Sequence, residues 1–236
     1  MSSLFGRVVK LAKTTFDRNN IDTLRTNFSA LKLLVDQITV ADLNVDQSIM
    51  TKEAFSLPEK APCTFVDIYR SDDLSMSIFI LDEEYTMPLH DHPMMYGILR
   101  AISGHIRVQS FSAIDQPPGD ISPSFLSRRQ PLVKIEQAKD VTTKTESATL
   151  TPTECNYHEI TAVGGPAAFF DILSPPYETN IPVYGSRNCN FYRKIVKSDS
   201  KLLLLERIPV PEHYYCDTAF YYAPDFLQDK ISDVHK

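Results

Sequence analysis

The chain has 236 residues, of which 43% are apolar and 23% charged, a composition ordinary for one globular domain that buries a core. Its 30 acidic and 24 basic residues leave a net charge of −6, so we expect no basic surface that attracts nucleic acid or an anionic membrane. No apolar stretch approaches the length needed to cross a bilayer. The four cysteines form no C-x-x-C pair, which favours reduced thiols in the cytoplasm. We therefore expect a single domain over residues 1–236 that works as a monomer.

The N-terminal segment, residues 1–45, is expected to be helical and to pack on the rest of the domain. Its apolar residues recur three and four positions apart, which places them on one helical face. These residues are Leu24, Phe28, Leu31, Leu34 and Val35. Asn19-Asn20 interrupts the pattern and separates two helices. Arg7, Lys10 and Lys13 precede the first acid, Asp17, so an organellar transit segment is the alternative interpretation of this helix. We expect a cytoplasmic location, with the nucleus and the mitochondrion as alternatives.

From about residue 62 onward the apolar residues follow the alternating period of β-strands. Between Leu74 and Ile80 every second residue is apolar, and residues 106–108 repeat this pattern. Further strands are expected over 166–173 and 191–196, and a surface loop rich in Pro, Ser and Asp over 112–130. Many short strands without alternating helices predict a β-sandwich or a barrel.

Three histidines are candidates for a metal site. His90 and His92 lie two residues apart, and such residues in a strand point to the same side, so both imidazoles can bind one ion. Pro88 and Pro93 flank them and stiffen the backbone. A His-x-His pair alone is weak evidence, but His158 supplies a third imidazole 66 residues after the pair. We therefore predict a site with three histidine ligands.

The remaining histidines, His105, His213 and His235, lie among polar residues and are expected at the surface. Three neutral imidazoles leave coordination positions open, which is typical of catalytic rather than structural sites. Imidazole suits zinc, copper, nickel and iron alike, so the ligand type leaves the metal open. The uncompensated charge of the ion favours a substrate that binds as an anion, as a thiol does once the metal displaces its proton.

The segment Pro88 to Pro93, PLHDHP, followed by Gly97, resembles the first cupin motif. The glutamate ligand of typical cupins is missing, because Tyr96 and Gly97 occupy its region. Together with YHEI at 157–160 and GPAAFFDILSPPY at 165–177, the pattern resembles the three-histidine thiol dioxygenases, the family of cysteamine (2-aminoethanethiol) dioxygenase and the plant cysteine oxidases. The resemblance implies a mainly β fold, a cupin-type double-stranded β-helix or jelly-roll barrel, with N-terminal helices.

The resemblance also implies an activity. Fe(II) held by His90, His92 and His158 would support addition of both atoms of O2 to a thiol, giving a sulfinate. The family's substrates are cysteamine and proteins with an N-terminal cysteine, and in the second role the enzymes act as oxygen sensors in an N-degron pathway. Asp171 and Tyr177 fall on positions that line the pocket. Asp171 would hold a ligand histidine or meet the substrate amine, and Tyr177 would donate to bound oxygen or sulfur; an ordinary hydrogen bond and an aromatic plug are the alternatives.

Some members of the family carry a cysteine and a tyrosine two residues apart that form a thioether. Here Cys189 is followed at that distance by Phe191, and Tyr192 would face the other side of the strand, so we expect no cross-link and a small buried Cys189. Asp91 points away from the ligands and is interpreted as structural. Arg100 is the arginine nearest the ligand motifs, but its facing is not fixed, so no clamp for a substrate carboxylate is assigned. Free cysteine is then expected to be a poorer substrate than cysteamine or Cys-initiated peptides.

Two other interpretations stay open. One is a cupin that holds zinc or nickel and performs different chemistry. The other is a cupin that binds a ligand or a protein partner without catalysis, although such a module has no need of open metal positions. Metal analysis and oxygen uptake with a thiol distinguish the three.

Overall fold

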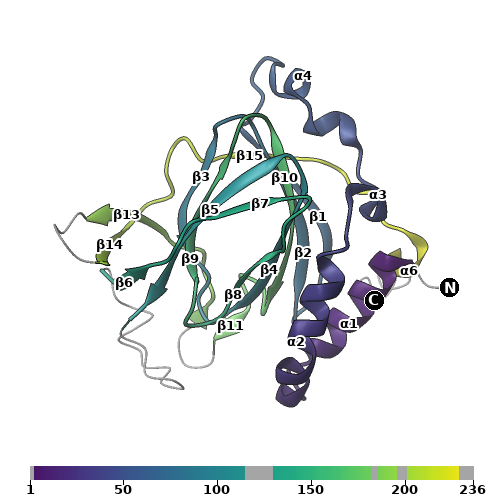
Figure 1. The fold of residues 1–236 in the computed structure, drawn as a ribbon, viewed down its shortest axis with the longest axis horizontal. Coiled ribbons are helices and arrows are strands. Elements are labelled where there is room, and N and C mark those ends of the chain that lie inside the picture. The colour runs from purple at the N-terminus through teal and green to yellow at the C-terminus, as the bar shows by residue number, and fades with distance from the viewer. Residues whose placement is uncertain (1–2, 115–129, 182–184, 196–200, 229–236) are drawn as a thin grey trace.

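The computed structural model describes residues 3–114, 130–181, 185–195 and 201–228. Figure 1 shows a β-barrel with helices along one side. The helices are α1 (Leu4–Thr15), α2 (Ile21–Val35), α3 (Val40–Leu43), the 3-10 turn η1 (Gln47–Met50), α4 (Lys52–Phe55) and α6 (Asp225–Gln228). The strands are β1 (Cys63–Arg70), β2 (Ser75–Leu81), β3 (Thr86–Asp91), β4 (Tyr96–Ser103), β5 (His105–Ala113), β6 (Leu132–Ile135), β7 (Lys139–Thr142), β8 (Ala148–Leu150), β9 (Tyr157–Ala162), β10 (Ala167–Ser174), β11 (Asn180–Ile181), β12 (Gly185–Ser186), β13 (Phe191–Ile195), β14 (Leu202–Ile208) and β15 (Cys216–Thr218).

Two large sheets form the barrel. One has the strand order β15-β1-β2-β10-β4-β8, and the other has the order β6-β14-β13-β3-β9-β5-β7. Because β6 pairs with β5 as well as with β14, the second sheet closes into a ring of antiparallel strands. The predicted cupin-type barrel with N-terminal helices is confirmed.

The barrel interior is apolar. Leu99 and Phe169 from the first sheet meet Val108 and Ile160 from the second in one buried cluster. Phe169 also stacks on Phe79 of β2, with 5.4 Å between ring centroids. Strand alternation explains this filling, because every second side chain of a barrel strand points inward. The cluster fixes the distance between the sheets, and the cavity described below lies beside it.

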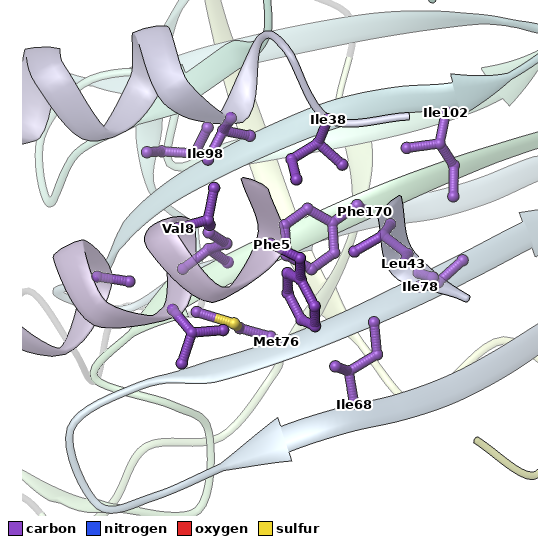
Figure 2. Packing of buried hydrophobic residues seen from close by; sticks show 14 of the residues in the cluster. Phe5, Val8, Ile38, Leu43, Ile68, Met76, Ile78, Ile98, Ile102 and Phe170 are labelled. Atoms are coloured by element: carbon purple, nitrogen blue, oxygen red, sulfur yellow. The ribbon is translucent and has the colours of Figure 1, made fainter. Parts of the chain in front are cut away.

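The first sheet is covered on its outer face by α1 and α2 (Figure 1). Phe5 and Val8 of α1 pack against this face, and the Phe5 ring meets the edge of Phe170 with 6.1 Å between centroids (Figure 2). Strand β10 is therefore buried on both faces, with Phe170 toward the helices and Phe169 toward the interior. This two-sided burial explains why its sequence is an apolar run without alternation. The N-terminal segment packs on the barrel as an amphipathic helical layer.

Two of the differences from the predicted elements concern β5 and β14. The loop predicted over 112–130 begins later, because β5 continues to Ala113 and Ser112 pairs with Lys134 of β6; residues 115–129 lie outside the described residues. Strand β14 was not predicted, because its first four residues are consecutive leucines without the alternation of a strand. Pairing with β13 makes this stretch a strand. Within the described residues, no helix is both long and apolar enough to cross a membrane.

Candidate metal centre

The three candidate ligands come from two neighbouring strands. His90 lies directly opposite His158 of β9, and His92 follows Asp91, the last residue of β3. The register of the β3–β9 pair shifts between Met87 and His90. This bulge contains Pro88, which cannot donate to a strand partner. Because Pro88 and Leu89 lie opposite the single residue Glu159 of β9, Met87 and His90 can face the same cavity although they are three positions apart.

The imidazoles converge on one point. The ring centroids lie 4.9 Å apart for His90 and His92, 4.7 Å for His90 and His158, and 4.6 Å for His92 and His158. One ligand atom from each residue lies within 4.8 Å of the others, and the three form a group able to hold a metal ion. The Nε2 atoms of His92 and His158 are 2.9 Å apart. Sequence reasoning had predicted this group in full.

Burial keeps the imidazoles neutral. Desolvation lowers the pKa of His90 to about 4, and it lowers the pKa of His92 and His158 well below the ordinary value, with further lowering from the neighbouring histidines. A neutral imidazole offers one lone pair, and its other nitrogen carries the proton. The donor set is therefore ready to bind a cation without first losing a proton.

Hydrogen bonds select the nitrogen that faces the centre. Nδ1 of His90 lies 2.8 Å from the carbonyl oxygen of Pro88, which can only accept, so Nδ1 carries the proton and Nε2 is free. The Tyr177 hydroxyl donates to the carbonyl oxygen of Asp91 at 2.5 Å and lies 2.9 Å from Nδ1 of His92. Since the phenol has one proton and donates it to Asp91, it accepts from His92 Nδ1–H. Tyr177 thus fixes His92 with Nε2 toward His158, as partners of metal-binding histidines commonly do.

The ligands form one wall of a cavity of about 330 Å³. Asp171, in the middle of β10, lines the cavity from the opposite sheet. Burial raises the pKa of Asp171 to about 7, and the backbone N–H of Ile172 only partly offsets this. Among the described residues, no hydrogen bond joins Asp171 to a histidine. The expected hold on a ligand histidine is therefore absent from the described contacts, and the contact with a substrate amine stays a prediction beside the ordinary hydrogen bond from the Ile172 backbone.

Arg100 does not line this cavity. Its guanidinium donates to the backbone oxygens of Ile38, Thr143 and Thr145, so it ties the chain after α2 to the loop after β7. No arginine or lysine is among the described residues around the cavity. The sequence left open which way the Arg100 side chain points, and the structure shows that it points away from the cavity.

Cys189 and Phe191 line the same cavity. Phe191 pairs with His90 across the β3–β13 contact. The Tyr192 hydroxyl faces the other side and donates to Oδ2 of Asp91 at 2.7 Å, which agrees with the strand alternation expected from the sequence. Asp91 also accepts from the backbone and side chain of Asn190, so it anchors the chain before β13. The structural role expected for Asp91 fits these contacts.

Sequence reasoning missed two features of the cavity. Tyr177, and not Tyr192, lines the cavity together with Cys189, and burial raises the pKa of the Cys189 thiol to about 12. Val210 and Tyr214, from the C-terminal segment, also line the cavity. No periodicity or motif in that segment gave a signal. His105 binds Asp140 at 2.9 Å and His213 is exposed, both away from the centre; His235 lies outside the described residues.

Comparisons with known proteins agree with the geometry. A family model described as PCO_ADO matches residues 34–226. The 2-aminoethanethiol dioxygenase of Mus musculus is 32% identical over 215 residues, which cover 83% of this chain and 81% of that protein. The Homo sapiens protein of the same name is 33% identical over 180 residues, covering 71% and 65%. Plant cysteine oxidase 2 of Arabidopsis thaliana is 26% identical over 167 residues, covering 70% and 56%.

Solved structures align over a smaller part of the chain. A cupin superfamily protein from Desulfitobacterium hafniense is 10% identical with a TM-score of 0.32, covering 50% of this chain and 83% of its own.

Proposed function

Because the chain belongs to the PCO_ADO family, we propose that it is a non-haem iron(II) thiol dioxygenase that converts a thiol and O2 into a sulfinate. The match to this family confirms the resemblance that was inferred from the motifs. The observation that carries the proposal is the convergence of three neutral imidazoles on one point of a cupin barrel. Iron, when bound there, would bring O2 and the thiolate together at its open positions.

The chain's own residues would hold His90, His92 and His158 in place and keep water out. Tyr177 and the Pro88 carbonyl orient two of the imidazoles. Apolar side chains make up most of the other lining, among them Phe79, Met87, Ile160, Phe169 and Leu173. This lining would keep water out, and a metal held by the three histidines would favour a substrate thiol that has lost its proton.

We propose cysteamine and Cys-initiated peptides as substrates. Both carry an amine two carbons from the thiol sulfur, and Asp171 is the carboxylate in the described lining that can meet it. Free cysteine adds a carboxylate, which usually needs an arginine partner. Arg100 faces away, and no other described cation lines the cavity. A carboxylate brought there would have no side-chain cation of the described residues as a partner in a largely apolar site, which is costly.

The direct test uses iron-loaded protein, with mass spectrometry of the products of cysteamine, a Cys-initiated peptide and free L-cysteine. We expect a gain of two oxygen atoms on the first two and a much lower kcat/KM for the third. An N-acetylated form of the same peptide is the matched control for the amine contact with Asp171. Free L-cysteine as the best substrate, or equal rates with and without acetylation, would refute the substrate assignment.

The same preparation separates the alternatives. A protein that purifies with zinc or nickel, and consumes no oxygen with any thiol after anaerobic iron loading, would be a different cupin enzyme or a binding module. We also propose that residues 1–236 act as one monomeric domain, which light scattering tests. Its proposed location is the cytoplasm, with the nucleus and mitochondrion as alternatives. We further propose that Cys-initiated proteins are its partners in an oxygen-sensing N-degron pathway, which the dependence of turnover on O2 concentration tests.

A further inference from the structure

Two cysteines outside the metal centre face each other. Cys63 opens β1, Cys216 opens β15, and the two are direct partners in the parallel pairing of these strands. Paired residues of neighbouring strands project to the same face, and strand spacing brings their Cα atoms to about 5 Å. This spacing lies within the range that a disulfide spans without moving the backbone. The two thiols are close enough for each to shift the pKa of the other.

We propose that Cys63 and Cys216 are a redox modification site, which forms a reversible disulfide by exchange with a low-molecular-weight disulfide. The Cys216 thiolate attacks one sulfur of the small disulfide and releases one small thiol. The Cys63 thiol then loses its proton, attacks the Cys216 sulfur and releases the second small thiol. Two protein thiols are oxidised by two electrons, and one small disulfide is reduced to two thiols.

The environments of the two sulfurs assign these roles. Cys216 is partly exposed, whereas Cys63 is fully buried. Hydrogen bonds from the Cys63 thiol and the Tyr214 hydroxyl outweigh burial and lower the pKa of Cys216, so it is the better attacking thiolate. The pKa of Cys63 is raised chiefly by its contact with Cys216. Once the Cys216 sulfur is bonded to the small thiol, it no longer carries a negative charge that opposes ionisation of Cys63. The positive charge of Lys60 still lowers the pKa of Cys63, so Cys63 ionises more easily.

The site is connected to the metal cavity. Tyr214 contributes to the lowered pKa of Cys216, lines the cavity and contacts the Phe191 ring with 5.2 Å between centroids. Strand β15 has only three residues, held to β1 by its pairing and by the ion pair of Lys60 with Asp217 at 2.7 Å. A covalent bond at Cys216 would fix the segment that supplies Val210 and Tyr214. Oxidation therefore restrains this wall of the cavity, and reduction releases it.

The experiment uses full-length iron-loaded protein with oxygen excluded, so neither outcome depends on dioxygenase turnover. The probe is oxidised glutathione, followed by acid quench, alkylation and peptide mapping. We expect loss of two hydrogens, a linked pair of peptides containing Cys63 and Cys216, and slower amide hydrogen exchange over 208–218. The Cys63→Ser variant should accumulate glutathione on Cys216. The Cys216→Ser variant, changed at a partly exposed position, should leave Cys63 unmodified.

Cys155 is the internal control, because it is also partly exposed but burial raises its pKa. It should react with glutathione more slowly than Cys216. Cys63 that remains alkylatable after denaturation, in wild-type protein whose Cys216 carries glutathione, would overturn the disulfide. A disulfide that leaves exchange over 208–218 unchanged would overturn the restraint of the cavity wall.

Discussion

The hydrogen bond between Tyr177 and His92 makes a quantitative prediction. Replacing Tyr177→Phe removes one oxygen atom and keeps the ring, which lies 5.5 Å from the His92 ring between centroids. His92 Nδ1–H then loses its acceptor and the Asp91 carbonyl oxygen loses a donor, both in a buried region. The proton of His92 is no longer held on Nδ1, so the tautomer that blocks Nε2 becomes accessible.

The expected loss of metal affinity is about 10- to 100-fold, the usual effect of removing a partner of a metal-binding histidine. This corresponds to roughly 1.4–2.7 kcal/mol. The free energy of unfolding of the metal-free protein should fall by about 1–3 kcal/mol, because a buried polar group is left without a partner. Anaerobic titration of Fe(II) against a chromophoric chelator measures the first quantity, and urea denaturation measures the second.

Tyr192→Phe is the matched control. It also removes a buried phenol oxygen bound to Asp91, but this oxygen donates to the carboxylate and does not touch His92. We expect a comparable loss of stability with unchanged metal affinity. Tyr177→Phe protein that binds Fe(II) as tightly as the wild type would refute the orienting role. An equal loss of affinity in both variants would show that the effect passes through Asp91 instead.

Four further predictions follow from the same contacts. His158→Ala removes one of three imidazoles and should abolish stoichiometric iron binding by metal analysis; full iron content and turnover would show that His158 is not a ligand. Asp171 binds its proton more tightly in the folded state, so its contribution to stability falls as pH rises from about 4 to about 7. Over this pH range the free energy of unfolding of metal-free Asp171→Asn protein should therefore rise relative to that of the wild type by an amount on the order of 4 kcal/mol. A difference that stays constant with pH would contradict the raised pKa of Asp171. Cys189 should carry no cross-link, so the intact mass should equal that of the unmodified sequence, and a loss of two hydrogens mapped to Cys189 and Tyr177 or another tyrosine would contradict this. Phe170→Ala should lower the free energy of unfolding by about 3–5 kcal/mol in urea denaturation, because Phe170 is fully buried beneath α1; a loss below 1 kcal/mol would mean that the helical layer repacks.

The sequence by itself determined the candidate ligands and the fold class. Side-chain identity decides metal chemistry, so His90, His92 and His158 could be chosen before any geometry was known. The helical period of residues 24–35 and the strand period of residues 74–80 reflect local burial, and both were predicted correctly. Asp171 was also detectable, because a lone carboxylate within an apolar run demands an explanation.

Only the tertiary structure decided how these residues are oriented. The shift in the β3–β9 register that turns His90 toward the cavity depends on pairing with a strand 66 residues away, which local periodicity does not encode. The same holds for the bond from Tyr177 to His92 and for the outward facing of Arg100. The partnership of Cys63 and Cys216 arises because a three-residue strand at the far end of the chain adds to the edge of the first sheet. Contacts of this kind depend on which strands lie next to one another. The packing of the whole barrel determines that arrangement, and the sequence of a single strand does not.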